Sequence, residues 1–467
     1  MLSKTDFLLY LEAPLHLWAK AHNQLIDKPP TPYEQHLMQQ GQQVEALAKK
    51  YIDTTLVRGE DHLTLLWQKT FDDRHYQIRT DALIYDQKSD NYDLYEIKSS
   101  TSIKTDHEYD LAFQVLLLES LLKLRHVYLI HINKTYELGE SLTLDQFFTF
   151  EEVSVQVEKR REAVRENRQA AYAVLQMPTP PTELACAKPK SCPCPSLCHP
   201  DLPEKSIYNI PRIGKKAVQL REMGITAIHE IPEDFNLNIK QRKHRDAVKN
   251  NRPLIETVEI RHSLAKLQFP LYFLDYETFN PAIPLFEGYR PYEHIVFQYS
   301  LFRINTPGQQ PIHNEYLITE EQDPAPDLVR ELFKHLGPEG SVVVWNQSFE
   351  SGCNANLARH CPAYADWLLQ INDRLYDLML IFRNGHYVHP DFHGSASLKA
   401  VLPVLCPDLK YENLSISNGE EAMLAWYRLQ KQEIEQEERQ NMEEAMRAYC
   451  KMDTYGMVAI WEHLRKL

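Results

Sequence analysis

The chain has 467 residues, more than one hydrophobic core usually organises, so two or three domains are expected. Its hydrophobic content of 43% and its charged content of 25% are typical of a globular protein in water. A formal net charge of −14 argues against a protein that coats nucleic acid without specificity, but it does not exclude a nuclease, because the metal sites of nucleases are themselves built from carboxylates.

The first residues predict an amphipathic helix and neither a membrane segment nor a signal peptide. The segment FLLYLEAPLHLW is interrupted by Glu12, Pro14 and His16, and no small-residue cleavage site follows it. No apolar run reaches the roughly 18 residues that a membrane span needs. Four of the eight cysteines lie between residues 186 and 198, which in a chain with no export signal favours a metal site over disulfide bonds. We therefore expect a cytoplasmic protein that makes no membrane contact.

Three regions of the chain differ in their pattern. Residues 1–203 begin with helices, show short strands between 63 and 99, and return to helices before an end rich in Pro and Cys. Residues 204–260 predict a short, basic, helical linker. From 268 to 467 strands alternate with helices, which is typical of an α/β sheet domain. The expected fold class is therefore α/β.

The first candidate site lies on two successive predicted strands, HYQIRTDALIYD and NYDLYEIKSS. The period of two places Glu96 and Lys98 on one face of their strand, and a neighbouring strand can bring Asp81 beside them. Converging carboxylates repel unless a cation lies between them, and Mg²⁺ or Mn²⁺ there would activate water and stabilise the departing phosphate oxygen. The lysine can orient the water or stabilise charge on the phosphate. An exposed hairpin of alternating charges is the other interpretation.

This order of elements resembles the RecB-type PD-(D/E)xK nucleases, including the CRISPR-associated iron–sulfur exonucleases. The resemblance also rests on the helical GQQVEALAKKY upstream and YDLAFQVLLLESLL downstream. It implies a restriction-endonuclease-like domain in which Asp81 and Glu96 bind metal, Lys98 is catalytic and Gln114 supports the site. Glu45 occupies the place where these nucleases usually have a metal-binding histidine, and it is the further ligand candidate.

The cysteine group is expected to hold a soft metal, because thiolates at this density select an iron–sulfur cluster or zinc. Unliganded thiols buried in a core are the other interpretation. The RecB-type resemblance implies a [4Fe–4S] cluster with one ligand from the N-terminus, where LEAPLHLW has Ala13 in the expected place of a cysteine. The fourth ligand could then come from the downstream group itself. We expect iron–sulfur, with zinc as the alternative, on Cys186, Cys192, Cys194 and Cys198.

The linker sequence SIYNIPRIGKKAVQLREMGITAIHEIP, residues 206–232, predicts a helix–hairpin–helix element. Backbone N–H groups near Gly214, with Lys215 and Lys216, would suit binding of a DNA phosphate without reading bases. The segment 240–252, KQRKHRDAVKNNR, has six Lys and Arg against one Asp and fits such a surface. The alternatives are a plain helical hairpin and a solvated helix face.

The second candidate site combines acids from three segments. Asp275 and Glu277 share one face of the apolar strand YFLDYETF, and burying both without a cation would be costly. Glu350 follows the apolar run SVVVW, at the expected start of a helix, while Tyr449 and Asp453 lie four residues apart on one face of a C-terminal helix. This set suits two-metal hydrolysis, with the tyrosine hydroxyl positioning water. A solvated strand edge and a chance helix spacing are the other interpretations.

The second set resembles the DnaQ-like, ribonuclease H-fold exonucleases with a D-E-D-D-y signature. The resemblance implies a mixed-sheet 3′–5′ exonuclease domain. In that family the second motif normally ends in Asp, where this chain has Glu350, and Asp377 is the reserve candidate for that role. The segment SLKAVLP resembles the helix before the last motif, and Lys399 within it is expected to be structural.

The combined order resembles a bacterial family that fuses a RecB-type nuclease to a ribonuclease H-like domain. The function expected is metal-dependent hydrolysis of DNA at two active sites, on single-stranded or end-containing DNA, in repair, recombination or defence. RNA trimming is the alternative within enzymes. A nucleic-acid-binding or adaptor protein with decayed sites, and a nuclease with a single working site, are the remaining alternatives.

Overall fold

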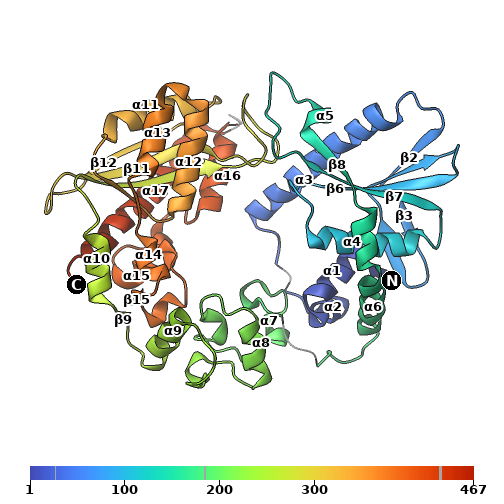
Figure 1. The fold of residues 1–467 in the computed structure, drawn as a ribbon, viewed down its shortest axis with the longest axis horizontal. Coiled ribbons are helices and arrows are strands. Elements are labelled where there is room, and N and C mark those ends of the chain that lie inside the picture. The colour runs from blue at the N-terminus through green and yellow to red at the C-terminus, as the bar shows by residue number, and fades with distance from the viewer. Residues whose placement is uncertain (27, 183–185, 431–433) are drawn as a thin grey trace. The chain divides into compact units, whose positions relative to one another are not determined.

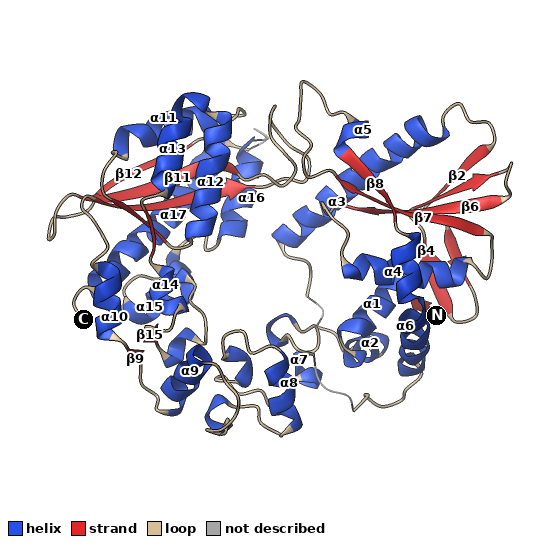
Figure 2. Ribbon diagram, in the orientation of Figure 1, coloured by secondary structure: helices blue, strands red, loops and turns tan. Residues whose placement is uncertain are grey.

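The computed structural model describes residues 1–26, 28–182, 186–430 and 434–467 (Figure 1). The chain forms two compact units, one of residues 1–201 with 281–292 and one of residues 202–280 with 293–467. Both combine helices with sheets, which confirms the α/β class in its coarse form (Figure 2). The predicted boundary at 203 lies next to the observed one. The predicted linker, however, groups with the second unit, and residues 281–292 group with the first.

The helices of the first unit begin at residues that satisfy their free N–H groups. Ser3 and Asp6 form a capping box at the start of the first helix, Pro14 opens the second, and Thr31 with Glu34 caps the third. The helical elements described here are α1 (Lys4–Glu12), α2 (Pro14–Ala21), α3 (Pro32–Tyr51), η1 (Ile52–Val57), α4 (Thr105–Leu118), α5 (Leu144–Phe147), α6 (Ser154–Leu175), η2 (Pro189–Ser191) and α7 (Pro195–Cys198).

The main sheet of the first unit has the strand order β2-β5-β6-β7-β8. Neighbouring strands are antiparallel except for β6 and β7, which are parallel and joined through α4. A smaller sheet has the order β1-β4-β3. The strands are β1 (Leu2–Ser3), β2 (Leu63–Trp67), β3 (Thr70–Asp72), β4 (Tyr76–Arg79), β5 (Ala82–Asp86), β6 (Asn91–Lys98), β7 (Leu124–Ile132) and β8 (Phe148–Glu152).

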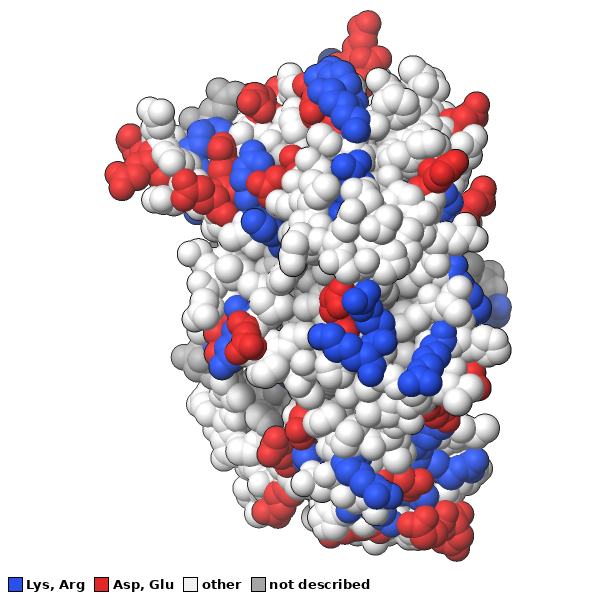
Figure 3. Space-filling view, turned by 90° about the vertical axis from the view of Figure 1, so that its left-hand side faces the viewer, with Lys and Arg blue, Asp and Glu red and all other residues white. Residues whose placement is uncertain are grey.

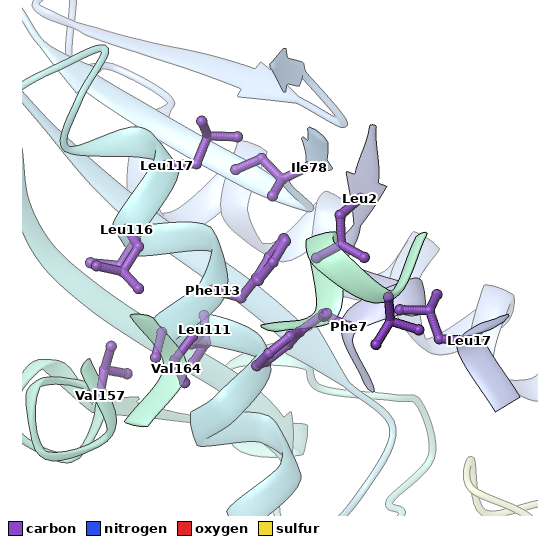
Figure 4. Close-up of a cluster of buried hydrophobic side chains, with 14 of the residues drawn as sticks. Leu2, Phe7, Leu17, Ile78, Leu111, Phe113, Leu116, Leu117, Val157 and Val164 are labelled. Atoms are coloured by element: carbon purple, nitrogen blue, oxygen red, sulfur yellow. The ribbon is translucent and has the colours of Figure 1, made fainter. Parts of the chain in front are cut away.

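The two faces of this sheet bury different side chains. Tyr95 and Ile97 pack with α3 and η1 on one face, whereas Leu94 packs with α1, α4 and α6 on the other. On that second side Phe7 stacks on Phe113 with ring centroids 4.9 Å apart (Figure 4). Because side chains alternate along β6, Glu96 and Lys98 share the face of Leu94, as the two-residue period predicted.

The second unit begins with short helical pieces and then forms a sheet of order β12-β11-β10-β13-β14. Strand β10 is antiparallel to β11 and parallel to β13, β12 is antiparallel to β11, and β14 is parallel to β13. A separate short ribbon pairs β9 with β15. The strands are β9 (Leu254–Ile255), β10 (Leu271–Phe279), β11 (Ile295–Ile304), β12 (Ile312–Leu317), β13 (Ser341–Val344), β14 (Leu375–Asp377) and β15 (Tyr387–Val388).

Helices cover both faces of this sheet. The helical elements described in the second unit are η3 (Ile207–Asn209), α8 (Lys215–Glu222), η4 (Ile228–Glu230), α9 (Ile239–Lys249), α10 (Thr257–Leu264), α11 (Ala325–His335), α12 (Gln347–His360), η5 (Pro362–Tyr364), α13 (Ala365–Asn372), α14 (Met379–Arg383), η6 (Pro390–Phe392), α15 (Leu398–Leu405), η7 (Tyr411–Asn413), α16 (Gly419–Gln430) and α17 (Gln436–Leu464).

Alternation along β10 decides which side chains meet which helices. Tyr272, Leu274 and Tyr276 pack with α11, α12 and α13. On the opposite face, Phe273 contacts Trp461 of α17 and Phe279 contacts Trp426 of α16, with ring centroids 5.8 and 5.6 Å apart. Asp275 and Glu277 therefore lie on the face that α16 and α17 cover.

Among the described residues, no helix is both long enough and apolar enough to cross a bilayer.

Candidate active sites and metal centre

Acidic side chains from three elements of the second unit come together around Asp275. Asp275 and Glu277 lie on β10, Glu350 lies in the first turn of α12 directly after β13, and Asp453 lies on α17. Because β13 runs parallel beside β10, the turn after β13 brings Glu350 to the same end of the sheet as the two acids. The predicted convergence of Asp275, Glu277, Glu350 and Asp453 is thus present in the structure.

Burial raises the pKa of each of these carboxyl groups, and repulsion within the group adds to it for Asp275 and Glu277. For Asp275, burial is the largest cause, followed by the charges of Asp453, Glu277 and Glu350. Burial and the charge of Asp453 raise the pKa of Glu277, and burial raises the pKa of Glu350 to about 8. The Oε2 atom of Glu350 is buried without a hydrogen-bond partner. As anions, these four groups need more positive charge than the single ammonium of Lys399, which acts on Glu277 and Asp453, can supply.

The donor set therefore fits divalent cations. Donor atoms of Asp275, Glu277 and Cys450 lie within 4.8 Å of one another, and Cys450 Sγ lies 3.7 Å from Asp275 Oδ2. Carboxylate oxygens are the ligands that Mg²⁺ and Mn²⁺ prefer, and the unpartnered Glu350 oxygen is one more such donor. Cys450 was not predicted, and its place three residues before Asp453 on α17 carries no separate sequence signal.

Two tyrosines flank Asp453. Tyr449 is buried one turn before Asp453 on α17, and burial followed by the charge of Asp453 raises the pKa of its hydroxyl. Tyr411, which the sequence analysis did not identify, donates a short hydrogen bond to Asp453 Oδ1. The Lys399 ammonium lies over both rings, 5.2 Å from the Tyr449 centroid and 5.7 Å from that of Tyr411. Lys399 thus holds the two phenol rings that face Asp453.

Asp377, the reserve candidate for the second motif, lies at the end of β14 and serves the local backbone. Its Oδ2 accepts from the Gln347 N–H at 3.3 Å, and its Oδ1 accepts from the Met379 N–H at 3.0 Å. Both oxygens therefore have partners, in contrast to Oε2 of Glu350. This difference favours Glu350 as the ligand of the pair.

In the first unit, Glu96 is fully buried and surrounded by donors. Lys98 Nζ donates to Glu96 Oε1 at 2.6 Å, and Gln114 Nε2 donates to Glu96 Oε2 at 2.8 Å. Burial alone would raise the pKa of Glu96, but Lys98 and Lys4 outweigh it and hold that pKa below its usual range. The predicted association of Glu96, Lys98 and Gln114 is present.

Asp81 joins this group from the break between β4 and β5. Its Oδ2 accepts from the Ile97 N–H at 2.8 Å, which fixes the carboxyl beside β6. Burial, and after it the charge of Glu96, raises the pKa of Asp81 to about 7. The predicted strand HYQIRTDALIYD is in fact two strands in different sheets, and Asp81 lies where the chain passes from one to the other.

Two charged residues of this site were not predicted. Asp110 on α4 is buried and accepts from Lys98 Nζ at 2.7 Å. Lys4 at the start of α1 donates to Glu96 Oε1 at 2.9 Å and lies 3.6 Å from Asp110 Oδ1. Asp110 lies four residues before Gln114, so helical spacing could have identified it, whereas nothing near Lys4 in the sequence points to this site.

This charge pattern differs from that of the second unit. Lys4 and Lys98 already balance much of the charge of Asp81, Glu96 and Asp110. The residues fit a divalent cation at Asp81 and Glu96, but the ion must compete with ammonium groups for the Glu96 oxygens.

Glu45 lies apart from these donors. It is on α3, which packs on the opposite face of the sheet from Glu96, and it accepts a short hydrogen bond from Gln68 Nε2. The Gln68 N–H in turn donates to the Asp81 carbonyl oxygen at 2.9 Å. Gln68 thus links Glu45 to Asp81, and the role of Glu45 as a metal ligand stays a prediction.

The cysteine group is buried together with two histidines. Cys192 Sγ lies 3.5 Å from His16 Nε2, Cys186 Sγ lies 3.3 Å from His199 Nε2, and Cys194 Sγ lies 3.7 Å from Cys198 Sγ. Donor atoms of His16, Cys186, Cys192 and Cys198 all lie within 4.8 Å of one another. The predicted convergence of the cysteines is present, but the set within this distance contains His16 and not Cys194.

The predicted helix–hairpin–helix element is only partly regular. Its first helix is the single turn η3, and its hairpin leads through Gly214, which has a φ of +52°, into α8 with Lys215 and Lys216 at the first two positions. Lys216 Nζ lies 3.2 Å from Gln241 Oε1. The hairpin therefore packs on α9, and its binding role stays a prediction.

The basic segment 240–252 is not a freely solvated face. Arg245 is buried and paired with Glu233 and Asp246, and Lys249 and Lys243 are paired with Glu233 and Glu256. Figure 3, which shows the side of the molecule at the left of Figure 1, likewise shows Lys and Arg in small groups among acidic residues. On this face the basic surfaces are consequently small and local.

One such local surface is a cavity of about 900 Å³ within the second unit. Its lining includes Arg212, Lys240, Arg242 and Arg383 together with aromatic residues, among them Phe382 and Phe392. Trp345, which ends the run before Glu350, stacks on Phe382 and donates to the Ala396 carbonyl oxygen at 3.1 Å. The wall of this basic, aromatic cavity is thus continuous with the segment that positions Glu350.

The chain is similar to known proteins whose descriptions state no activity. A family model described as "Domain of unknown function (DUF2779)" matches residues 272–397, which include Asp275, Glu277 and Glu350 but not Asp453. The chain is similar to the uncharacterized protein UU173 of Ureaplasma parvum serovar 3, with 25% identity over 284 residues, 56% of this chain and 41% of that protein. It is also similar to the uncharacterized protein MG366 of Mycoplasma genitalium, with 23% identity over 219 residues, 43% of this chain and 33% of that protein. The chain therefore spans less than half the length of these curated relatives. No solved structure matches it significantly.

Proposed function

We propose that the chain is a metal-dependent nuclease that hydrolyses DNA phosphodiester bonds at two centres, a DnaQ-like 3′–5′ exonuclease centre around Asp275 and a RecB-type centre around Glu96. The observation that carries the proposal is the buried acid group of the second unit, in which Glu350 Oε2 has no partner. Burial of so many carboxylates is destabilising unless a ligand compensates it, so selection for a binding function explains the arrangement.

The order of strands supports both assignments. In the second unit, the strand that carries Asp275 lies at the centre of β12-β11-β10-β13-β14, the order expected of a ribonuclease H-like sheet. In the first unit, helix α3, the antiparallel strands β2, β5 and β6, helix α4 and the parallel strand β7 follow in the order expected of a restriction-endonuclease-like core.

In the second unit, Asp275, Glu277, Glu350 and Asp453 are the residues that would hold Mg²⁺ or Mn²⁺. When bound, such ions supply an activated water and stabilise charge on the leaving 3′ oxygen. The protein's own contribution is to position groups. The Tyr449 hydroxyl can orient the attacking water, while Tyr411 holds Asp453 in place.

In the first unit, Asp81 and Glu96 would hold the ion and Lys98 would stabilise charge on the phosphate. Gln114 donates to one Glu96 oxygen and also to Asp110 at 3.1 Å, so it holds both carboxylates in position beside the Lys98 ammonium. Asp110 orients the Lys98 ammonium from the other side.

The cavity next to the Glu350 segment supports a proposal for the substrate class. Arginine and lysine side chains attract phosphates, and aromatic rings stack on unpaired bases, so a single strand fits this lining better than a duplex. Single-stranded or end-containing DNA is therefore the proposed substrate, and a matched RNA is the alternative to be tested.

The test is a time course on 5′-labelled single-stranded DNA with Mn²⁺, using wild type, Lys98→Ala, Asp275→Asn and the double variant. The Asp275→Asn change should slow stepwise shortening from the 3′ end by about 10²- to 10⁴-fold, because a metal-binding carboxylate is lost. The Lys98→Ala change should remove a second set of products, which differs from the stepwise 3′ shortening that depends on Asp275. Glu412→Gln, an exposed acid beside Tyr411, is the matched control and should keep wild-type rates.

Each outcome decides between the interpretations. An inert double variant with two distinct single-variant patterns supports two centres, and loss of all products in one single variant supports one working centre. Equal inactivity of wild type and the double variant on both DNA and RNA would contradict the nuclease proposal and favour a binding protein.

A further inference from the structure

We infer that His16, Cys186, Cys192 and Cys198 form a binding site for a single zinc ion, and not for an iron–sulfur cluster. The site lies in the first unit and involves none of the residues of the two carboxylate centres, so the inference does not depend on the proposed nuclease activity.

The distances between the donor atoms indicate a single ion. A tetrahedral zinc ion, with Zn–S bonds of about 2.3 Å and Zn–N bonds of about 2.0 Å, holds its ligand atoms about 3.5 to 3.8 Å apart. The separation of Cys192 Sγ from His16 Nε2 is 3.5 Å, and all four donor atoms lie within 4.8 Å of one another. In a cubane cluster each thiolate binds a different iron, so the ligand atoms must lie farther apart than around one ion.

The chemistry of the donors agrees with this geometry. Three thiolates and one imidazole are a common ligand set of structural zinc. All four residues are at least nine-tenths buried, and His16 is 3% exposed. Such a site has no open position for water, which distinguishes a structural ion from a catalytic one.

The fold explains how His16 replaces the N-terminal cysteine. Ala13, in the place where the resemblance predicts cysteine, is the residue before α2 and packs in the same core as the four cysteines. His16 lies one turn further along α2, and its longer side chain reaches Cys192. The Ile26 N–H donates to the Pro193 carbonyl oxygen at 2.8 Å, which holds the chain after α2 against the cysteine segment.

Two neighbours contact residues of the site but lie outside the group of donor atoms that are all within 4.8 Å of one another. Cys194 lies 3.7 Å from Cys198 but is not in the set within 4.8 Å, and His199 lies 3.3 Å from Cys186 and is likewise outside it. Both therefore serve as matched controls, because they are a cysteine and a histidine in the same buried surroundings.

The experiment measures metal content of the full chain purified without oxygen, together with its absorption spectrum. Wild type should contain about one zinc per chain and be colourless, and replacement of zinc by Co²⁺ should give the visible bands of a tetrahedral thiolate site. His16→Ala should lower zinc affinity by more than the roughly 10- to 100-fold that loss of an outer-shell partner costs, whereas Cys194→Ser and His199→Ala should keep the ion. His16→Cys should retain zinc, which separates loss of a ligand from failure to fold.

Several results would overturn the inference. Brown protein with iron and acid-labile sulfide would assign a cluster, and zinc loss in Cys194→Ser with retention in His16→Ala would assign a four-cysteine site. Protein free of both metals after zinc supplementation would leave the group as buried thiols, contrary to the inference.

Discussion

Tyr411 acts on the candidate exonuclease centre through Asp453, since its hydroxyl donates to Asp453 Oδ1 while Lys399 lies over its ring. A carboxylate held by such a donor is oriented before a cation arrives. Removing the donor leaves the carboxylate present but less well positioned, and outer-shell partners of metal ligands commonly act in this way.

Tyr411→Phe should therefore raise the Mn²⁺ concentration for half-maximal exonuclease activity by about 10- to 100-fold. Unfolding free energy should change by only about 1 kcal/mol, the typical contribution of one hydrogen bond. A Mn²⁺ titration of the rate checks this. Tyr455→Phe, on the exposed side of α17, is the control, and an unchanged Mn²⁺ requirement in Tyr411→Phe would remove Tyr411 from the centre.

Lys4 and Lys98 share one oxygen of Glu96, so two ammonium groups occupy a position that a cation would need. Lys4 is the more dispensable of the two, because Lys98 also contacts Asp110 at 2.7 Å. Removal of Lys4 leaves buried negative charge that a divalent ion can neutralise in place of the ammonium.

Lys4→Met should lower the unfolding free energy of the first unit by about 1 to 3 kcal/mol in the presence of a chelator. Saturating Mn²⁺ should restore more stability to this variant than to wild type. Thermal unfolding with chelator and with Mn²⁺ measures both effects, and Lys20→Met, whose partner Asp6 is outside the site, is the control. An equal Mn²⁺ response in both variants would show that Lys4 does not compete with the ion.

At the scale of elements, the loop between η6 and α15 is fixed by a close approach to the segment before α8. Gly394 has a φ of +76°, and a Cβ there would lie 1.6 Å from the Asn209 carbonyl oxygen. Only glycine fits, because both the backbone conformation and the space exclude a side chain. This contact holds one wall of the basic cavity next to the Trp345–Glu350 segment.

Gly394→Ala should destabilise the second unit by about 2 kcal/mol or more, since strain and a backbone clash add. Gly352→Ala, at an exposed helical position of α12 with no atom near the added Cβ, should instead stabilise by about 0.5 to 1 kcal/mol. Denaturant unfolding of the two variants measures the difference. Equal stability would show that the loop accommodates the added atom by moving.

At the scale of the whole molecule, the first unit is discontinuous in sequence. Residues 281–292 belong to it although both flanking segments belong to the second unit. Ala282 is fully buried there and its N–H donates to Gln40 Oε1 at 2.8 Å, and Tyr289 is buried next to Leu138, with which it shares a backbone hydrogen bond.

An isolated fragment of residues 1–203 should consequently be less stable than the same fragment with 281–292 fused through a flexible linker. The difference should be about 3 kcal/mol or more, comparable to deletion of one large buried side chain. Hydrogen exchange around α3 and β8 in the two fragments measures it. Equal protection would mean that residues 281–292 add nothing to the unit.

The sequence alone determined the features that depend on local periodicity and on residue type. Asp275 with Glu277, Glu96 with Lys98, and Tyr449 with Asp453 could be placed on shared faces because strands repeat every two residues and helices every 3.6. The mixed α/β class and the boundary near residue 203 followed from the same patterns. The two residues of each pair are close to each other in the chain, so their spacing alone is enough to relate them.

The tertiary structure decided which distant residues complete each site. Lys4, Tyr411 and His16 join their partners through packing of helices onto sheets, and this packing depends on the whole core and not on local spacing. The grouping of residues 281–292 with the first unit follows in the same way, and so does the presence of His16, not Cys194, among the donor atoms that lie within 4.8 Å of one another. Contacts between residues more than a hundred positions apart, such as His16 with Cys192, leave no periodic trace in a single sequence.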